Sequence, residues 1–227
     1  MKYGKIVEGT FIERPNRFIA MVDISGTVER CHVKNTGRCR ELLIPGAKVF
    51  LSVPDNPSRK TKYDLIAVKK GDRLINMDSQ IPNDIAEEGL RKIPMFSDVT
   101  SIRREFTYGD SRIDMMAEGS SKRYLIEVKG VTLEDNRAVR FPDAPTERGV
   151  KHIGELVKSL KDGYIPCLLF VIQMDDVDHF EPNRSTDPAF ADALAEAAEA
   201  GVNIIAYTCS VTPDSIELKD PVEVVLT

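Results

Sequence analysis

The chain has 227 residues, of which 42% are hydrophobic and 30% charged, and its formal net charge is −5. This composition excludes a largely disordered chain, because enough apolar side chains are present to build a core. No apolar stretch approaches the length of a membrane span, and the opening residues lack the hydrophobic segment of a secretory signal. We therefore expect a cytoplasmic protein with no membrane partner. The four cysteines form no CxxC pair, so neither a zinc site nor a disulfide framework is indicated.

The charge is divided unevenly along the chain. Residues 1–80 contain 15 basic and 9 acidic side chains, whereas residues 81–227 contain 16 basic and 27 acidic ones. This asymmetry predicts that the first part contacts a phosphate backbone and that the second holds a carboxylate metal site. Because the whole chain is acidic, we expect nucleic-acid binding to be local to the basic part and sensitive to salt.

The N-terminal part shows about five short β-rich runs, which are separated by turn residues such as Ser25-Gly26 and Pro45-Gly46. This pattern predicts a small barrel. Among small barrels, those of the OB type bind nucleic-acid strands. We expect Phe18 and Phe50 to fill the core of this barrel.

Within this part, the segment HVKNTGRCRELL combines hydrogen-bond donors with a flexible turn that lets backbone amides approach an anion. The residues that we predict to bind DNA here are Lys34, Asn35, Thr36, Arg38 and Arg40. The spacing is equally compatible with an Asn-Thr-Gly turn that caps a short helix from Arg40 to Leu43.

The segment IPNDIAEEGLRKIP predicts an amphipathic helix that begins at Asn83 or Asp84. We place the domain boundary here, with a barrel over residues 1–82 and a second domain over residues 83–227. The second domain is predicted to be mixed α/β. Its elements are strands near 102–107, 112–117 and 123–128, a long helix, the apolar strand IPCLLFVIQM, an alanine-rich helix and the strand VNIIAYTC.

Two acids and a lysine form the most informative pattern in this domain. Asp114 lies in SRID, and Glu127 and Lys129 lie in YLIEVKG. Because strand side chains alternate, Glu127 and Lys129 share one face, and pairing of 112–117 with 123–128 would place Asp114 beside Glu127. Two converging carboxylates suit Mg²⁺ or Mn²⁺, and the lysine is then placed to orient a nucleophilic water. The alternative is a solvated strand face with an ordinary ion pair.

A basic helix follows this strand. Thr146 is its expected N-cap, and Arg148 and His152 lie close enough to the preceding loop to be candidates for the site. Lys151 is a candidate for contact with a phosphate, but it is equally suited to surface pairs at helical spacing with Glu147 and Glu155.

The segments SRIDMM, YLIEVKGVTL, FPDAPTERGVKH and NTGRCRELLIPGAKVFL closely resemble the sugar fermentation stimulation protein A (SfsA) family of bacteria and archaea, over nearly the whole chain. The resemblance implies an N-terminal OB-type barrel and a C-terminal domain similar to PD-(D/E)XK nucleases. It gives Asp114 and Glu127 the place of the metal-binding acids and Lys129 that of the catalytic lysine. For a third acid it favours Glu105, with Glu87 or Glu88 of the preceding helix as alternatives.

The resemblance also implies that His32 and Gly37 lie near the C-terminal site, together with the Asn-Thr-Gly turn. It implies DNA binding without sequence specificity and a regulatory part in sugar metabolism, particularly of maltose. The fold implies a Mg²⁺- or Mn²⁺-dependent nuclease. The alternatives are a catalytically inactive DNA-binding or regulatory module and, given the acidic overall charge, an interaction protein that binds no nucleic acid.

Overall fold

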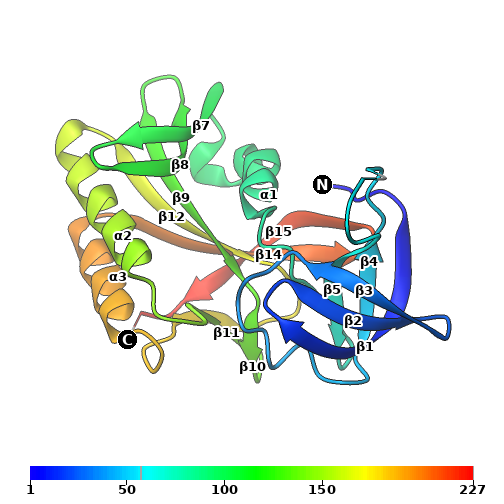
Figure 1. The fold of residues 1–227 in the computed structure, drawn as a ribbon. Helices are drawn as coiled ribbons and strands as arrows, with labels where there is room; N and C mark the ends of the chain where they lie inside the picture. Colours follow the sequence, from blue (N-terminus) through cyan, green and yellow to red (C-terminus); the bar gives the residue numbers. More distant parts are fainter. Residues whose placement is uncertain (57, 227) are drawn as a thin grey trace.

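The computed structural model describes residues 1–56 and 58–226. It shows a mixed α/β protein in which an N-terminal barrel lies beside a larger C-terminal domain built on one sheet (Figure 1). Among the described residues, no helix is both long and apolar enough to span a membrane.

The barrel is a six-stranded sheet with the order β3-β2-β1-β4-β5-β6, and an additional pairing of β3 with β5 closes it. Its strands are β1 (Ile6–Asn16), β2 (Ile19–Ile24), β3 (Thr27–Val33), β4 (Lys48–Ser52), β5 (Asp64–Lys70) and β6 (Arg73–Asn76). Alternate side chains such as Ala20 and Val22 are fully buried, as expected for strands with one face toward a core. The predicted OB-type barrel is therefore present.

Two local predictions in the barrel are wrong. Phe18 does not fill the core, because it lies in the turn between β1 and β2 and keeps 42% of its surface exposed. Residues 40–42 form a turn in place of the alternative short helix, since the backbone N–H groups of Leu42 and Leu43 both donate to the carbonyl of Cys39.

The C-terminal sheet has nine strands in the order β10-β11-β13-β15-β14-β12-β9-β8-β7. The strands are β7 (Ser101–Tyr108), β8 (Ser111–Glu118), β9 (Arg123–Val131), β10 (Leu133–Asp135), β11 (Ala138–Phe141), β12 (Ile165–Ile172), β13 (His179–Pro182), β14 (Asn203–Thr212) and β15 (Ser215–Val224). The apolar strand β12 lies between β9 and β14, parallel to both, and is buried over nearly its whole length. This is the central position that its uninterrupted apolar sequence predicts.

Helices cover both faces of this sheet. Leucine and phenylalanine side chains of α2 (Glu147–Ser159) and α3 (Pro188–Ala200) pack on one face, whereas α1 (Pro82–Gly89) packs on the other face, near the barrel (Figure 1). Short 3₁₀ turns follow α1 and α2. The predicted N-cap of α2 is confirmed, since Thr146 Oγ1 accepts the Gly149 N–H at 3.0 Å. Helix α1 begins at Pro82, earlier than predicted, and no side chain caps it.

Candidate active site

Strands β8 and β9 bring Asp114 and Glu127 together. Met115 pairs with Ile126 in the antiparallel ladder, so Asp114 lies opposite Glu127 at the next position. The ladder ends there, and Asp114 Oδ2 accepts the Val128 N–H at 2.8 Å in place of a backbone carbonyl. The predicted strand pairing is therefore present, and the two carboxylates share one face of the sheet.

The two oxygens of Glu127 have different surroundings, although the whole side chain is buried. Its Oε1 accepts hydrogen bonds from the Lys129 ammonium group and from His152 Nδ1. Arg148 Nε donates to His152 Nε2 at 3.3 Å, so Nδ1 is the ring nitrogen that carries the proton toward Glu127. Oε2 of Glu127 is buried and has no hydrogen-bond partner.

The two carboxyl groups also differ in acidity. Burial, and next the charge of Glu127, raise the pKa of Asp114 above its usual value. Burial also acts to raise the pKa of Glu127, but the hydrogen bond from His152 and the charge of Lys129 outweigh it and leave that pKa lowered. Glu127 is therefore held as a carboxylate, while a second negative charge on Asp114 is costly unless a cation is bound.

Both acids line a pocket of about 300 Å³, whose wall also includes Asn83, Lys129 and Arg148. A second pocket of about 210 Å³ adjoins it, since both are lined by Ser79, Pro82, Gly130 and Phe141. This second pocket lies between the domains, and the barrel contributes Asn35, Thr36 and Gly37 to it. The predicted turn of the barrel therefore reaches the mouth of the site.

The donor set fits a small divalent cation. Glu127 Oε2 is an unsatisfied acceptor, and Asp114 supplies a second carboxylate in the same pocket. Among the described residues, no group of three or more His, Cys, Asp or Glu side chains converges as a complete ligand set. A cation here would therefore rely on backbone oxygens and water for its remaining ligands, which is usual for Mg²⁺.

The third predicted acid does not line this pocket. Glu105 has the register position opposite Asp114, but its backbone is left-handed (φ 54°) and its carboxylate pairs with Arg112 at 2.9 Å. The two glutamates of α1 that were the alternative third acids form ion pairs elsewhere. Glu87 pairs with Arg104 at 3.6 Å, and Glu88 pairs with the amino group of Met1 at 2.6 Å.

Helix α1 instead contributes Asn83, which sequence reasoning considered only as a helix start. Its Nδ2 donates to Asp114 Oδ1 at 2.9 Å. The only sequence signal was an amide side chain directly after Pro82, at the start of a helix expected to precede the acidic strands.

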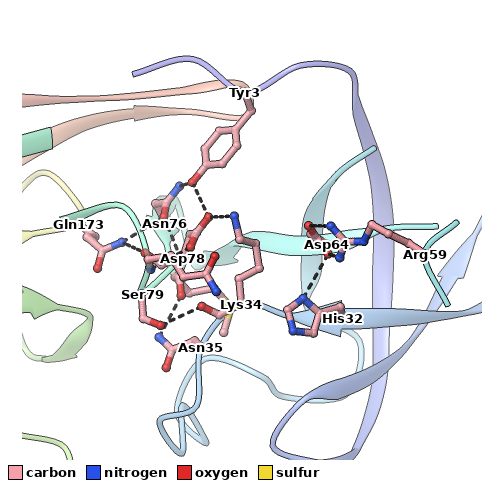
Figure 2. Close-up of polar contacts among 12 residues, drawn as sticks. Tyr3, His32, Lys34, Asn35, Arg59, Asp64, Asn76, Asp78, Ser79 and Gln173 are labelled. Atoms are coloured by element: carbon pink, nitrogen blue, oxygen red, sulfur yellow. Dashed lines mark hydrogen bonds and ion pairs between the residues drawn. The ribbon is translucent and has the colours of Figure 1, made fainter. Parts of the chain in front are cut away.

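Two of the predicted DNA-binding residues of the barrel have structural roles. The Lys34 ammonium pairs with the fully buried Asp78 at 2.7 Å, and Figure 2 shows its side chain directed toward that carboxylate. Asn35 is buried, where its Nδ2 donates to the Met77 carbonyl and its Oδ1 accepts the Gly37 N–H. Both residues hold the turn against the segment that links the domains.

The remaining candidates of the barrel are divided between the pocket and the surface. Thr36 and Gly37 line the interdomain pocket, and a Cβ on Gly37 would lie 2.5 Å from Asp143 Oδ2 and 2.9 Å from Asn35 Oδ1, so these side chains would have to move to admit one. Arg38 and Arg40 are exposed. His32 lines neither pocket, since its Nδ1 lies 3.2 Å from Asp64 Oδ1, beside Arg59 (Figure 2).

On α2, Arg148 and His152 both lie at the site, since Arg148 lines the pocket and His152 donates to Glu127. Lys151 does not line the pocket. Its ammonium donates to the Asp110 carbonyl at 2.9 Å, so it ties the helix to the turn between β7 and β8.

Comparison with known proteins agrees with this architecture. The profile of the sugar fermentation stimulation protein RE domain matches residues 80–215, and that of the SfsA N-terminal OB domain matches residues 12–77. A sugar fermentation stimulation protein homolog of Clostridium beijerinckii is 57% identical over 226 residues, which cover 100% of both chains. A homolog of Ruminiclostridium cellulolyticum is 55% identical over 224 residues, which cover 99% of both chains.

A solved structure shows the same fold. Pyrococcus furiosus SfsA, determined in complex with Ca²⁺, superposes with a TM-score of 0.88 at 30% sequence identity, and the match covers 99% of this chain and 98% of that one. The resemblance seen in the sequence motifs is thus confirmed over the full length. The chain belongs to the sugar fermentation stimulation protein (SfsA) family, with the SfsA N-terminal OB domain followed by the sugar fermentation stimulation protein RE domain.

Proposed function

We propose that this protein is a divalent-metal-dependent nuclease that cleaves phosphodiester bonds in DNA without sequence preference. The observation that carries this proposal is the buried Glu127 Oε2, which lacks a partner and lies beside Asp114 in a pocket. A buried acceptor without a partner costs about 1–3 kcal/mol, so a cation at this place would stabilise the site.

The nature of the metal follows from the ligands. Asp114 and Glu127 would hold the ion, and two carboxylates with room for water suit Mg²⁺ or Mn²⁺. The Ca²⁺ in the Pyrococcus furiosus structure supports a site for hard cations in this family. Bound there, the ion would stabilise the charge that develops on the phosphate and make a nearby water more acidic.

The side chains of this chain supply positioning and charge. The Lys129 ammonium lies at the pocket wall beside Glu127, where it orients the attacking water and offsets negative charge on the phosphate. His152 holds Glu127 Oε1, and the exposed Arg148 guanidinium, which also lines the pocket, pairs with a phosphate oxygen of the substrate. Hydrolysis then adds the hydroxyl of water to phosphorus and returns its proton to the leaving oxygen.

The experiment measures cleavage of labelled single- and double-stranded DNA by the purified protein with Mg²⁺ or Mn²⁺. Asp114→Asn and Lys129→Ala should each lower the rate by about 10²-fold or more, because one removes a metal ligand and the other the group beside the water. EDTA should abolish cleavage. Asp72→Asn is the matched control, since Asp72 is fully exposed on the barrel, and it should cleave at the native rate.

The third acid can be decided by titrating the cleavage rate with Mn²⁺, which gives the apparent Mn²⁺ affinity of each variant. Glu105→Gln should leave Mn²⁺ affinity unchanged, because the Glu105 carboxylate pairs with Arg112 and does not line the pocket. A large loss of affinity would show that Glu105 moves to the metal. Cleavage that persists in both Asp114→Asn and Lys129→Ala would reject the proposed active site.

A second function is favoured by one observation. The Lys129 ammonium already balances the charge of Glu127, and His152 donates a hydrogen bond to the same oxygen, so the fold is compatible with a catalytically inactive module that binds DNA. Such a module would regulate sugar metabolism, in line with the name of the relatives, sugar fermentation stimulation protein homolog. The resemblance of the sequence motifs adds maltose as the particular sugar. DNA binding that survives in Asp114→Asn, together with no metal-dependent cleavage by the native protein, would select this second function.

A further inference from the structure

We propose that Phe18 and Arg17, in the turn between β1 and β2, form a stacking platform for an unpaired base. The substrate is then a nucleic acid with a single-stranded segment next to the cleaved phosphate. This inference rests on the proposed function, because it names the kind of nucleic acid that the same site receives.

The Phe18 ring is exposed and held in place. It retains 42% of its surface, and the Arg17 guanidinium lies 4.7 Å from the ring centroid. The backbone around it is fixed, since the Phe18 N–H donates to Asn16 Oδ1 at 2.9 Å and its carbonyl accepts the Val33 N–H at 2.8 Å. A fixed aromatic ring beside a cation is a surface on which bases stack.

Arg14 ties this platform to the turn at the interdomain pocket. Its two Nη atoms donate to four backbone carbonyls, those of Arg17 at 2.7 Å, Asn35 at 2.6 Å, Gly37 at 2.8 Å and Arg38 at 2.9 Å. Since these donors are engaged by the backbone, Arg14 is a positioning residue and makes no phosphate contact. It holds the Phe18 turn and residues 35–38 as one rigid surface.

This surface continues into the active site. Residues 35–37 line the interdomain pocket, which shares Gly130 and Phe141 with the pocket of Asp114 and Glu127. Within residues 1–56 and 58–226, the guanidinium groups of the exposed Arg17, Arg38 and Arg40 form no ion pair with a carboxylate, whereas the backbone N–H of Arg38 donates to Asp143 Oδ2 at 3.2 Å. A strand whose phosphate lies at the two acids can therefore cross the interdomain pocket and continue along positive charge to Phe18.

The platform selects unpaired bases for a geometric reason. Bases inside a duplex already stack on their neighbours, and an enzyme reaches their faces only after they are unpaired. A single strand offers its ring faces without this cost, whereas a duplex would meet this surface through its phosphates alone.

The test measures binding of fluorescent oligothymidine containing one 2-aminopurine, and of the matching duplex, to the full-length protein in EDTA, so that no metal-dependent cleavage occurs. Phe18→Ala should weaken binding of the single strand by about 5- to 150-fold, which corresponds to the loss of one stacked base. It should leave duplex affinity unchanged. It should also remove the quenching of 2-aminopurine fluorescence, and Phe18→Trp should restore both properties.

Val28→Ala is the matched control, because Val28 is 57% exposed and pairs with Asp23, at the other end of the β2–β3 ladder from Phe18. This variant should bind both nucleic acids as the native protein does. Single-strand affinity that is unchanged in Phe18→Ala, or that falls equally for the duplex, would overturn the platform while the nuclease proposal stands. The opposite outcome is also distinguishable. If Phe18→Ala weakens only single-strand binding, as expected, but Asp114→Asn cleaves DNA at the native rate, the nuclease proposal is rejected and the platform is retained.

Discussion

Asp114 depends on two groups outside its own strand. Its Oδ1 accepts from Asn83 Nδ2 at 2.9 Å and its Oδ2 accepts from the Val128 backbone at 2.8 Å. These bonds favour the charged form, although burial and Glu127 together keep the pKa of Asp114 raised. Asn83 therefore both orients the carboxylate and prepares it for a cation.

This geometry predicts the effect of Asn83→Ala on metal binding. Loss of the donor should lower Mn²⁺ affinity by about 10- to 100-fold, because the partners of a metal ligand fix its orientation. Isothermal titration calorimetry measures the change. Asn203→Ala, whose amide donates to the Pro166 carbonyl at 3.1 Å, is the matched control and should bind Mn²⁺ normally. Equal affinities in the native protein and Asn83→Ala would contradict a role for this amide.

Among the elements, α2 carries Arg148 and His152 to the site, and its start is joined to α3 through one side chain. Asp187 caps α3 by accepting the Phe190 N–H at 3.0 Å, and its other oxygen accepts the Thr146 N–H at 2.8 Å. Since Thr146 is itself the N-cap of α2, the first turns of both helices are fixed together.

Thr146→Ala should therefore destabilise the protein by about 1 kcal/mol, the usual cost of removing an N-cap side chain. Urea unfolding measures this loss. Thr146→Ser keeps the hydroxyl that accepts the Gly149 N–H, so it should unfold close to the native midpoint. If the serine variant were as unstable as the alanine variant, the methyl group and not the cap would be responsible.

For the whole molecule, buried charges hold the two domains together. Glu134 of β10 is 5% exposed and pairs with Lys70 at 2.7 Å and with Arg73 at 3.0 Å, both from the barrel. Burial acts to raise the pKa of Glu134, but the hydrogen bonds from Lys70 and from the Arg137 backbone outweigh it and leave that pKa lowered. The folded protein therefore stabilises the ionised carboxylate of Glu134 relative to the unfolded chain.

Because the pKa of Glu134 is lower in the folded protein than in the unfolded chain, this group stabilises the fold at neutral pH and not in acid. The contribution of Glu134 is complete above about pH 5 and is lost as the pH falls through the folded pKa. Glu134→Gln should reduce the free energy of unfolding by about 1–3 kcal/mol at pH 7, and the difference should shrink below about pH 4. Urea unfolding at several pH values measures it, with the exposed Glu196→Gln as control. A difference that stays constant with pH would contradict this account.

The strand pairing that joins Asp114 to Glu127, the central strand β12 and the N-cap of α2 could all be predicted from the chain alone. Each depends on local alternation, apolar runs or capping, which neighbouring residues dictate. The OB and nuclease-like folds were predicted from family motifs.

Other features depend on which elements meet in space. Asn83 reaches Asp114 because α1 packs on the sheet, Lys34 is drawn to a buried Asp78, and Glu105 pairs with Arg112. Phe18 is exposed because its turn extends beyond the barrel core. These contacts join residues far apart in the chain or depend on backbone geometry, so no periodic pattern records them; the folded arrangement of strands, helices and domains sets them.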